Sequence, residues 1–149
     1  MPMRKVFLVT AITAFLVTGA HAHMGATGVV LERMEAMKSI ASAVKAIKSQ
    51  LTSDNYSSTV VSENAALIEA HSGKAFTKLF PKGSEGAPSE ASPLIWKDWA
   101  AFEKIADDLK ESAGILKGVA SDQASLKEPF TNMLKTCGAC HKKFREKLN

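Results

Sequence analysis

The sequence predicts an all-α fold, an antiparallel up-down-up-down bundle of four helices, from three observations. Apolar residues recur at spacings of three and four through most of residues 23–149, which places them on one face of a helix. No segment alternates apolar and polar residues with a period of two, so no strand or hairpin is indicated. Four such helices with mostly short connections form an antiparallel bundle.

The first helix is expected over residues 27–52. Thr52 to Asn55 form a loop by composition, because Thr, Ser, Asp and Asn favour turns. The apolar stripe of this helix consists of Val30, Met34, Met37, Ala41 and Val44, widened by Ile40, Ile47 and Leu51.

The second helix is expected to begin after Ser57, a good N-cap residue, and to end at Phe80, because Pro81 and Gly83 stop it. Residues 81–92 hold two prolines and two glycines and form the longest irregular loop.

The third helix is expected to begin at Ser92-Pro93, an N-cap residue followed by proline in the first helical position, and to run to about Leu116. The fourth begins after Ser121-Asp122. Pro129 lies inside its apolar pattern and should kink it or split off a short first piece.

Residues 1–22 are typical of a secretory signal peptide that is cleaved after Ala22. A positively charged start precedes an uncharged run over residues 6–20, and Ala20-His21-Ala22 is a small-x-small cleavage pattern. The run is shorter than the ~20 residues that a membrane-spanning helix needs. We therefore expect an exported protein whose mature chain, residues 23–149, is one four-helix-bundle domain without a membrane anchor.

Composition excludes several classes. Two cysteines are too few for a disulfide-rich scaffold. The chain carries 19 basic and 15 acidic residues, and two of the basic residues lie in the predicted signal segment, so the mature chain is only weakly basic. No block of Lys and Arg interleaves with aromatic residues, so no nucleic-acid partner is indicated.

Cys137-Gly138-Ala139-Cys140-His141 is C-x-x-C-H, the attachment signature for c-type haem. Residues three and four apart lie on one face of a helix. Both thiols can therefore form thioethers with the two vinyl groups of one porphyrin, while His141 directs a ring nitrogen at the iron. We predict one covalently attached haem c per chain, with Cys137 and Cys140 as attachment residues and His141 as the proximal iron ligand.

Three other interpretations of the motif are less consistent with the sequence. A thioredoxin-like dithiol needs a strand-helix-strand context, which is not indicated here. A structural zinc site needs four ligands, and only His23 or His71 is left in the mature chain to complete it. A plain disulfide leaves His141 without a role.

Met37 is the candidate for the distal iron ligand. In an antiparallel bundle the end of the fourth helix lies beside the start of the first. Met37 is then about level with His141 and lies on the inward stripe. A thioether opposite a histidine is a standard axial pair that raises the haem potential. Three alternatives stay open: Met37 as a core residue, Met34 as the ligand, and His71 as the ligand.

The surroundings of the haem can also be predicted. Arg33, near Met37, and Arg145, one turn after His141, are candidates for contacts with the haem propionates or the pocket, and solvated charges are the alternative. Six residues that the bundle brings to the same end are candidates for an apolar wall of the haem pocket, and core packing is the alternative: Phe76, Leu79, Phe80, Trp96, Trp99 and Phe102.

These features resemble the cytochrome c′ family, the class II c-type cytochromes, over essentially all of the mature chain. Residues 33–38 resemble the family's first-helix motif, in which the residue before the lysine faces the distal side of the haem. Residues 78–81 and 92–96 resemble the low-spin branch, cytochrome c-556, and residues 137–145 resemble the terminal motif.

The resemblance implies an exported, periplasmic haem protein of bacterial type, a monomer or a homodimer. In the low-spin branch the distal methionine binds iron. In the high-spin branch the same position only crowds an open face, where nitric oxide or carbon monoxide binds. The methionine at position 37 and the sequence of the 81–92 loop favour the low-spin branch.

Two functions follow from these branches. With both axial sites filled, the haem exchanges electrons through its exposed edge, and lysines near that edge suit an acidic redox partner: Lys135, Lys142, Lys143 and Lys147. With a five-coordinate iron, the protein binds nitric oxide or carbon monoxide instead. We expect no enzymatic activity, because no distal histidine-arginine pair is placed for cleavage of an oxygen–oxygen bond.

Overall fold

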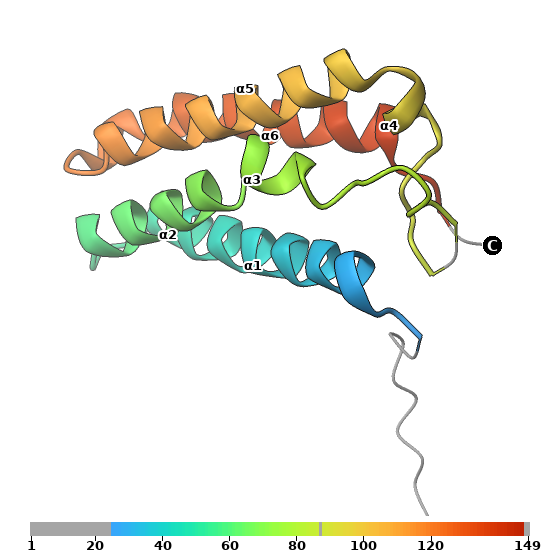
Figure 1. The fold of residues 1–149 in the computed structure, drawn as a ribbon. Helices are drawn as coiled ribbons and strands as arrows, with labels where there is room; N and C mark the ends of the chain where they lie inside the picture. The colour runs from blue at the N-terminus through green and yellow to red at the C-terminus, as the bar shows by residue number, and fades with distance from the viewer. Residues whose placement is uncertain (1–24, 87, 148–149) are drawn as a thin grey trace, which may run out of the picture.

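The structure is a computed structural model that describes residues 25–86 and 88–147. Four long helices form two layers, with α1 and α2 in one and α5 and α6 in the other, and α1 and α6 run in opposite directions (Figure 1). This arrangement confirms the predicted all-α bundle. The helical elements are α1 (Gly28–Gln50), α2 (Ser58–Ala70), α3 (Lys74–Thr77), α4 (Leu94–Lys97), α5 (Trp99–Gly118), the 3-10 turn η1 (Gln123–Ser125) and α6 (Lys127–Phe144).

Over the two described ranges the chain forms no β-strand, and an isolated antiparallel bridge pairs Ala91 with Arg145. None of the helices described here combines the length and the apolar character needed to cross a membrane. The predicted signal segment, residues 1–22, lies outside the described residues, as does His23.

The first helix and the start of the fourth helix agree with the sequence analysis. Helix α1 falls within the predicted range 27–52. The predicted short first piece of the fourth helix is η1, and the Asp122 carboxylate caps it by accepting a hydrogen bond from the Ala124 N–H at 3.0 Å. Pro129 lies in the first turn of α6, where a missing N–H loses no intrahelical bond.

The predicted second helix starts where expected but ends too late. The Ser57 hydroxyl accepts a hydrogen bond from the Val60 N–H at 3.3 Å, which confirms the N-cap. The prediction of one helix to Phe80 was wrong, because α2 ends at Ala70 and the chain turns before the short helix α3.

Gly73 is the physical reason for this break. Its φ of 59° is in the left-handed region, which side chains with a Cβ rarely adopt. A Cβ at this position would lie 2.9 Å from the Asp107 carboxylate, and the Gly73 N–H donates to the carbonyl of Ala106 on α5 at 2.9 Å. The close approach to α5 therefore needs a glycine, and it interrupts a helix whose apolar pattern continues on both sides.

The predicted third helix is also divided, so the expectation of one continuous helix was wrong. The start signal is confirmed, since the Ser92 hydroxyl accepts a hydrogen bond from the Leu94 N–H at 3.3 Å. Asp98, with φ −129° and ψ 56°, then separates α4 from α5. Aspartate is unfavourable inside helices, and here its carboxylate accepts a hydrogen bond from Lys143 of α6 at 2.5 Å.

The buried side chains fall into two groups. The aliphatic cluster joins all four long helices and consists of Ile40, Ala43, Ile47, Val61, Ala65, Ile68, Ala113, Leu116, Ala120, Leu126, Phe130 and Met133. The aromatic cluster occupies the other end of the bundle and consists of Ala36, Leu79, Phe80, Ile95, Phe102 and Phe144, with Phe76, Trp96 and Trp99 packed against them. The candidate site lies at the end that holds the aromatic cluster.

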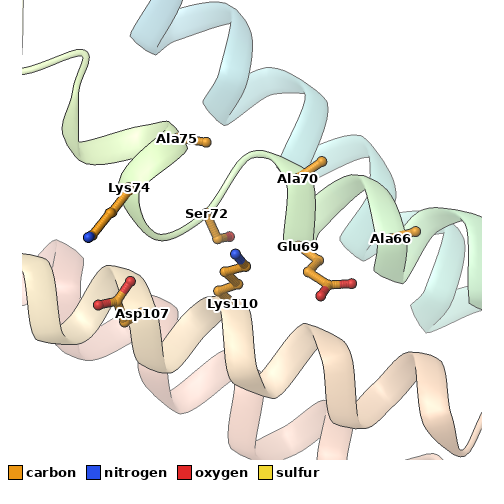
Figure 2. Close-up of a pocket in the computed structure, with 8 residues that line it drawn as sticks. All are labelled: Ala66, Glu69, Ala70, Ser72, Lys74, Ala75, Asp107 and Lys110. Atoms are coloured by element: carbon orange, nitrogen blue, oxygen red, sulfur yellow. The ribbon is translucent and has the colours of Figure 1, made fainter.

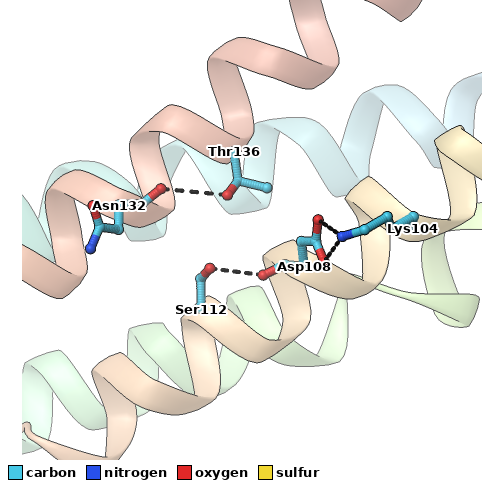
Figure 3. Close-up of polar contacts among 5 residues, drawn as sticks. All are labelled: Lys104, Asp108, Ser112, Asn132 and Thr136. Atoms are coloured by element: carbon cyan, nitrogen blue, oxygen red, sulfur yellow. Dashed lines mark hydrogen bonds and ion pairs between the residues drawn. The ribbon is translucent and has the colours of Figure 1, made fainter.

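The polar contacts of α5 and α6 that Figure 3 draws stay within each helix. Lys104 contacts both carboxylate oxygens of Asp108, one turn later, at 2.7 and 2.8 Å. The hydroxyls of Ser112 and Thr136 donate to carbonyls four residues earlier in their own helices, those of Asp108 and Asn132. These contacts support the individual helices, whereas the packing between the helices depends on the two clusters.

Candidate functional site

The C-x-x-C-H motif lies in the second half of α6. Cys137 and Cys140 are free thiols with partly buried side chains, and Cys140 packs against the aromatic cluster. His141 is more exposed than either cysteine. The helix places one sulfur on the aromatic cluster, while the imidazole remains accessible to a ligand.

The protonation states suit a thiol pair beside a neutral imidazole. Burial raises the pKa of Cys137, and burial together with the nearby Cys137 raises the pKa of Cys140 to about 11, so both thiols are protonated at neutral pH. Partial burial of the ring lowers the pKa of His141, and the positive charge of Arg145 lowers it further. The negative charge of Glu90 raises it by a smaller amount. The neutral imidazole is the form that binds a metal.

The aromatic residues predicted to form a wall are brought together. Phe102 of α5 is their centre and is almost fully buried. Its ring centroid lies 4.9 Å from Phe80, 5.4 Å from Phe144 and 5.6 Å from Trp99. Because Phe144 follows His141 by three residues on α6, this cluster directly supports the helix turn that carries the motif.

Met37 is half-buried on α1, at the junction of the two clusters. Its side chain packs against the aliphatic cluster, while its neighbour Ala36 belongs to the aromatic cluster. The aliphatic cluster joins the second half of α1 to the first half of α6. The two helices are antiparallel, so Met37 lies toward the same end of the bundle as the motif (Figure 1). Met34, also half-buried, lies one turn earlier.

Helices α1 and α6 approach each other less closely than the other neighbouring pairs do. The close backbone contacts run from α1 to α2, from α2 to α5 and from α5 to α6. The two helices that carry Met37 and the motif therefore have less backbone contact with each other than any of these three pairs has.

The two arginines predicted to contact haem hold other partners in the structure. Arg33 is buried, and its guanidinium binds the connection between α3 and α4, defined here as residues 78–86 and 88–93. Arg145 is exposed and donates to the Glu90 carboxylate in the same connection at 2.6 Å. Contact of either arginine with a haem propionate stays a prediction.

Sequence analysis did not single out the partners of Arg33. Ser84 and Ser89 are ordinary loop residues by composition, and nothing in their spacing marks them. A signal for the burial of Arg33 did exist, because positions 33, 37, 40 and 44 follow the same four-three-four spacing as the apolar stripe of α1.

A surface concavity of about 460 Å³ lies elsewhere on the molecule (Figure 2). It lies between α5 and the turn from α2 to α3. Its lining combines positively charged lysines, negatively charged carboxylates and small residues: Ala66, Glu69, Ala70, Ser72, Lys74, Ala75, Asp107 and Lys110. Within the described residues, no group of three or more His, Cys, Asp and Glu side chains is arranged to hold a metal ion.

The side chains present fit a covalently attached haem. Two thiols and a neutral imidazole lie within one helical segment, a thioether lies toward the same end on the opposite helix, and aromatic rings pack behind the motif. A helical bundle with this set of side chains defines a c-type haem protein.

Comparison with known proteins identifies the family. The sequence model of the family described as Cytochrome C′ matches residues 28–145, so the chain belongs to the cytochrome c′ family. Its cofactor is haem c, covalently bound, and the protein is a c-type cytochrome of electron transport.

Relatives and a solved structure agree with this assignment. The chain is 31% identical to a cytochrome c′ of Rhodopseudomonas palustris over 93% of this chain and 96% of the relative. It is 30% identical to a cytochrome c-556 of Agrobacterium fabrum over 82% and 84% of the two chains. A solved structure of cytochrome c′ from Rhodopseudomonas palustris has a TM-score of 0.74 at 32% identity, covering 83% of this chain and all of the other.

Proposed function

We propose that this protein is an exported monohaem electron carrier whose low-spin iron is ligated by His141 and Met37. The position of Met37 carries the proposal. It is a half-buried thioether at the junction of the two clusters, on the helix that runs antiparallel to the motif helix. A methionine and a histidine as axial ligands leave no iron site for a substrate, so electron exchange is the chemistry that remains.

Each group of residues has a defined task in this proposal. Cys137 and Cys140 attach the haem through thioethers, and His141 binds the iron in its neutral form. When bound, the haem supplies an iron centre that takes up and releases one electron. The aromatic cluster excludes water from the side of α6 on which it packs, and exclusion of water favours a raised potential.

Exposed lysines on and after the motif helix suit an acidic redox partner. Their side chains are accessible to solvent in the structure, at positions Lys135, Lys142, Lys143 and Lys147. Positive charge around a haem edge raises the rate of encounter with a negatively charged protein, and salt lowers that rate. We propose that this surface receives the partner, in the periplasm after cleavage of residues 1–22.

The test is the optical spectrum of the purified protein, oxidised and reduced, with and without carbon monoxide. The proposal predicts a low-spin spectrum that carbon monoxide leaves unchanged. Met37→Ala should turn high-spin and bind carbon monoxide. Met34→Ala is the matched control, because Met34 is also half-buried one turn earlier, and it should keep the spectrum of the wild type.

The second candidate function is binding of nitric oxide or carbon monoxide by a five-coordinate iron. One observation favours it: Met37 packs against the aliphatic cluster as a core residue would. A high-spin wild type that takes up carbon monoxide would establish this function in place of electron transfer. Loss of the low-spin spectrum in Met34→Ala alone would instead assign the iron to Met34.

Export has a separate test. The N-terminal sequence of the protein recovered from the periplasm should begin at His23, and its mass should match residues 23–149 with one haem. A chain that still starts at Met1, or that stays in the cytoplasm, would contradict the proposed signal peptide.

A further inference from the structure

Arg33 holds the α3–α4 connection against α1. Its Nε donates to the carbonyl of Leu79 at 2.6 Å, and its Nη1 donates to the carbonyl of Ser84 at 2.9 Å and to the hydroxyl of Ser89 at 3.2 Å. Its Nη2 donates to the Ser84 hydroxyl, which in turn donates to the carbonyl of Pro81 at 2.6 Å. Three separate points of the connection are thus tied to one side chain of α1.

The guanidinium is also enclosed by aromatic rings. Its central carbon lies 4.1 Å from the ring centroid of Phe80 and 6.0 Å from that of Trp96. The Trp96 indole N–H donates to the carbonyl of Phe80 at 3.0 Å, which keeps these two rings together. Only 5% of the Arg33 surface is exposed, so its hydrogen bonds are shielded from competing water.

The other end of the same connection is tied to the end of α6. The Ser92 N–H donates to the carbonyl of Phe144 at 3.0 Å, and the Glu146 N–H donates to the carbonyl of Glu90 at 2.8 Å. The Ser92 hydroxyl also donates to the Glu146 carboxylate at 2.8 Å. These bonds begin three residues after His141.

Ser89 joins the two sets of bonds. Its hydroxyl oxygen accepts from Arg33 Nη1 and from the Ala91 N–H, both at 3.2 Å. Ala91 forms the isolated bridge with Arg145. Hydrogen bonds therefore lead from α1, one turn before Met37, through the connection to the chain that directly follows the motif.

We propose that Arg33 is a positioning residue: by fixing the α3–α4 connection, it sets the separation between Met37 on α1 and the motif on α6, and so sets the fraction of iron that Met37 ligates. This inference rests on the proposed function. It follows from the limited backbone contact between α1 and α6. Side chains of the aliphatic cluster join the two helices away from the motif, so their separation at the motif end depends on what bridges them there.

The proposed role depends on the shape of the side chain as well as on its charge. A guanidinium offers five N–H donors in a rigid fork, and lysine offers a single ammonium with the same charge. Arg33→Lys therefore keeps the positive charge but loses the simultaneous bonds to Leu79, Ser84 and Ser89. The double variant Ser84→Ala/Ser89→Ala removes the two hydroxyl acceptors and leaves Arg33 unchanged.

Two readouts test the proposal on the haem-loaded protein. The first is trypsin cleavage after Lys82, an exposed residue of the connection, followed by mass spectrometry. Both variants should be cleaved about tenfold faster than the wild type, because loss of local hydrogen bonds raises the population of the open connection. The second is the oxidised spectrum, in which the low-spin fraction should fall by about half or more.

Ser57→Ala is the matched control. It removes a cap at the start of α2, outside both clusters, so it lowers global stability without touching the connection. It should leave the low-spin fraction and the cleavage after Lys82 close to wild-type values when measured well below its melting temperature.

The outcomes separate this proposal from the proposed function. Faster cleavage with an unchanged spectrum would overturn the link from Arg33 to Met37. An unchanged cleavage rate after Lys82 in Arg33→Lys, which loses the fork of donors and keeps the charge, would overturn the fixing of the connection by Arg33. A high-spin wild type would overturn Met37 ligation itself, and the cleavage rates would then still decide whether Arg33 fixes the connection.

Discussion

The aliphatic and aromatic clusters hold opposite ends of the bundle together in different ways. The aliphatic cluster is built from long helices that pack directly on one another. The aromatic cluster depends on short helices and an irregular connection, on Gly73 and Asp98 where helices are interrupted, and on the polar bonds of Arg33. The haem attachment motif belongs to the second, less regular end.

Under the proposed function, this difference marks the end of the bundle that is adapted to the cofactor. Helical periodicity alone can produce the aliphatic end, since apolar stripes on four helices suffice to assemble it. The aromatic end needs individual contacts, such as the rings around Phe102. Under the proposed attachment of haem to α6, these rings would form a wall beside the porphyrin.

The sharpest test of this difference is the pair Phe102→Ala and Leu116→Ala. Each removes a side chain that is almost completely buried, one from each cluster. We expect Phe102→Ala to lower the free energy of unfolding by about 3–5 kcal/mol and Leu116→Ala to lower it by about 2–5 kcal/mol, as measured by urea unfolding. Only Phe102→Ala should also lower the ratio of haem to protein and change the visible spectrum.

The comparison would fail if Leu116→Ala disturbed the haem spectrum as strongly as Phe102→Ala. The two ends would then act as one unit, and the aromatic cluster would have no separate role in holding the cofactor.

A smaller effect is expected from the interruption between α2 and α3. Gly73→Ala should cost about 1–3 kcal/mol, because alanine is strained at a positive φ and its Cβ would approach the Asp107 carboxylate. Gly118→Ala is the control, since nothing lies within 4 Å of a Cβ there, and it should stabilise α5 by up to about 1 kcal/mol. Melting temperatures of the two variants should move in opposite directions.

Ser57→Ala should cost about 1 kcal/mol, the usual value for the loss of an N-cap. Thermal unfolding measures the loss, and the haem spectrum should not change. A spectral change in this variant would show that the start of α2 is coupled to the site.

The smallest effects concern exposed ion pairs, one on each side of the comparison. A hydrogen bond from Lys117 and its charge lower the pKa of Glu69 below its ordinary value of 4.5. A hydrogen bond from Lys143 lowers the pKa of Asp98 below 3.8. A lowered carboxyl pKa adds stability above the unfolded-state pKa, and this stability disappears as the pH falls through the folded-state value.

Glu69→Gln and Asp98→Asn should therefore each be slightly less stable than the wild type at neutral pH. As the pH falls below about 4, the stability of each variant should decrease less than that of the wild type. Both pairs are exposed to solvent, so the two variants should behave alike and added salt should reduce the effect. Urea unfolding across a pH series measures this. A much larger effect of Asp98→Asn would show that the break between α4 and α5 depends on Lys143.

Sequence reasoning located the regular part of the fold and the motif. The ranges of α1 and α6, the cap at Ser57 and the grouping of the aromatic residues follow from periodicity and from capping rules. The breaks at Gly73 and Asp98 did not, because the apolar stripe continues across each of them. The Ser72-Gly73 pair was a signal for the first break, whereas the signal at Asp98 was weaker and consisted of the low helix propensity of aspartate.

For the candidate site, the sequence predicts which residues hold the haem, and their roles stay predictions. Cys137, Cys140 and His141 are recognised by their spacing, and Met37 by its register on α1. The bonds of Arg33 were not predicted, because a loop's carbonyls and hydroxyls are placed by the tertiary fold, which local sequence does not encode.

The bonds of Arg33 also bear on how this protein can change over evolutionary time. Two of its acceptors are the main-chain carbonyls of Leu79 and Ser84, which every amino acid supplies. Mutations can therefore replace the loop side chains other than Ser84 and Ser89 one after another while these acceptors persist. Arg33 has no such freedom, since no other side chain offers the same donors. Among descendants of this gene, the loop should diverge quickly and the arginine slowly.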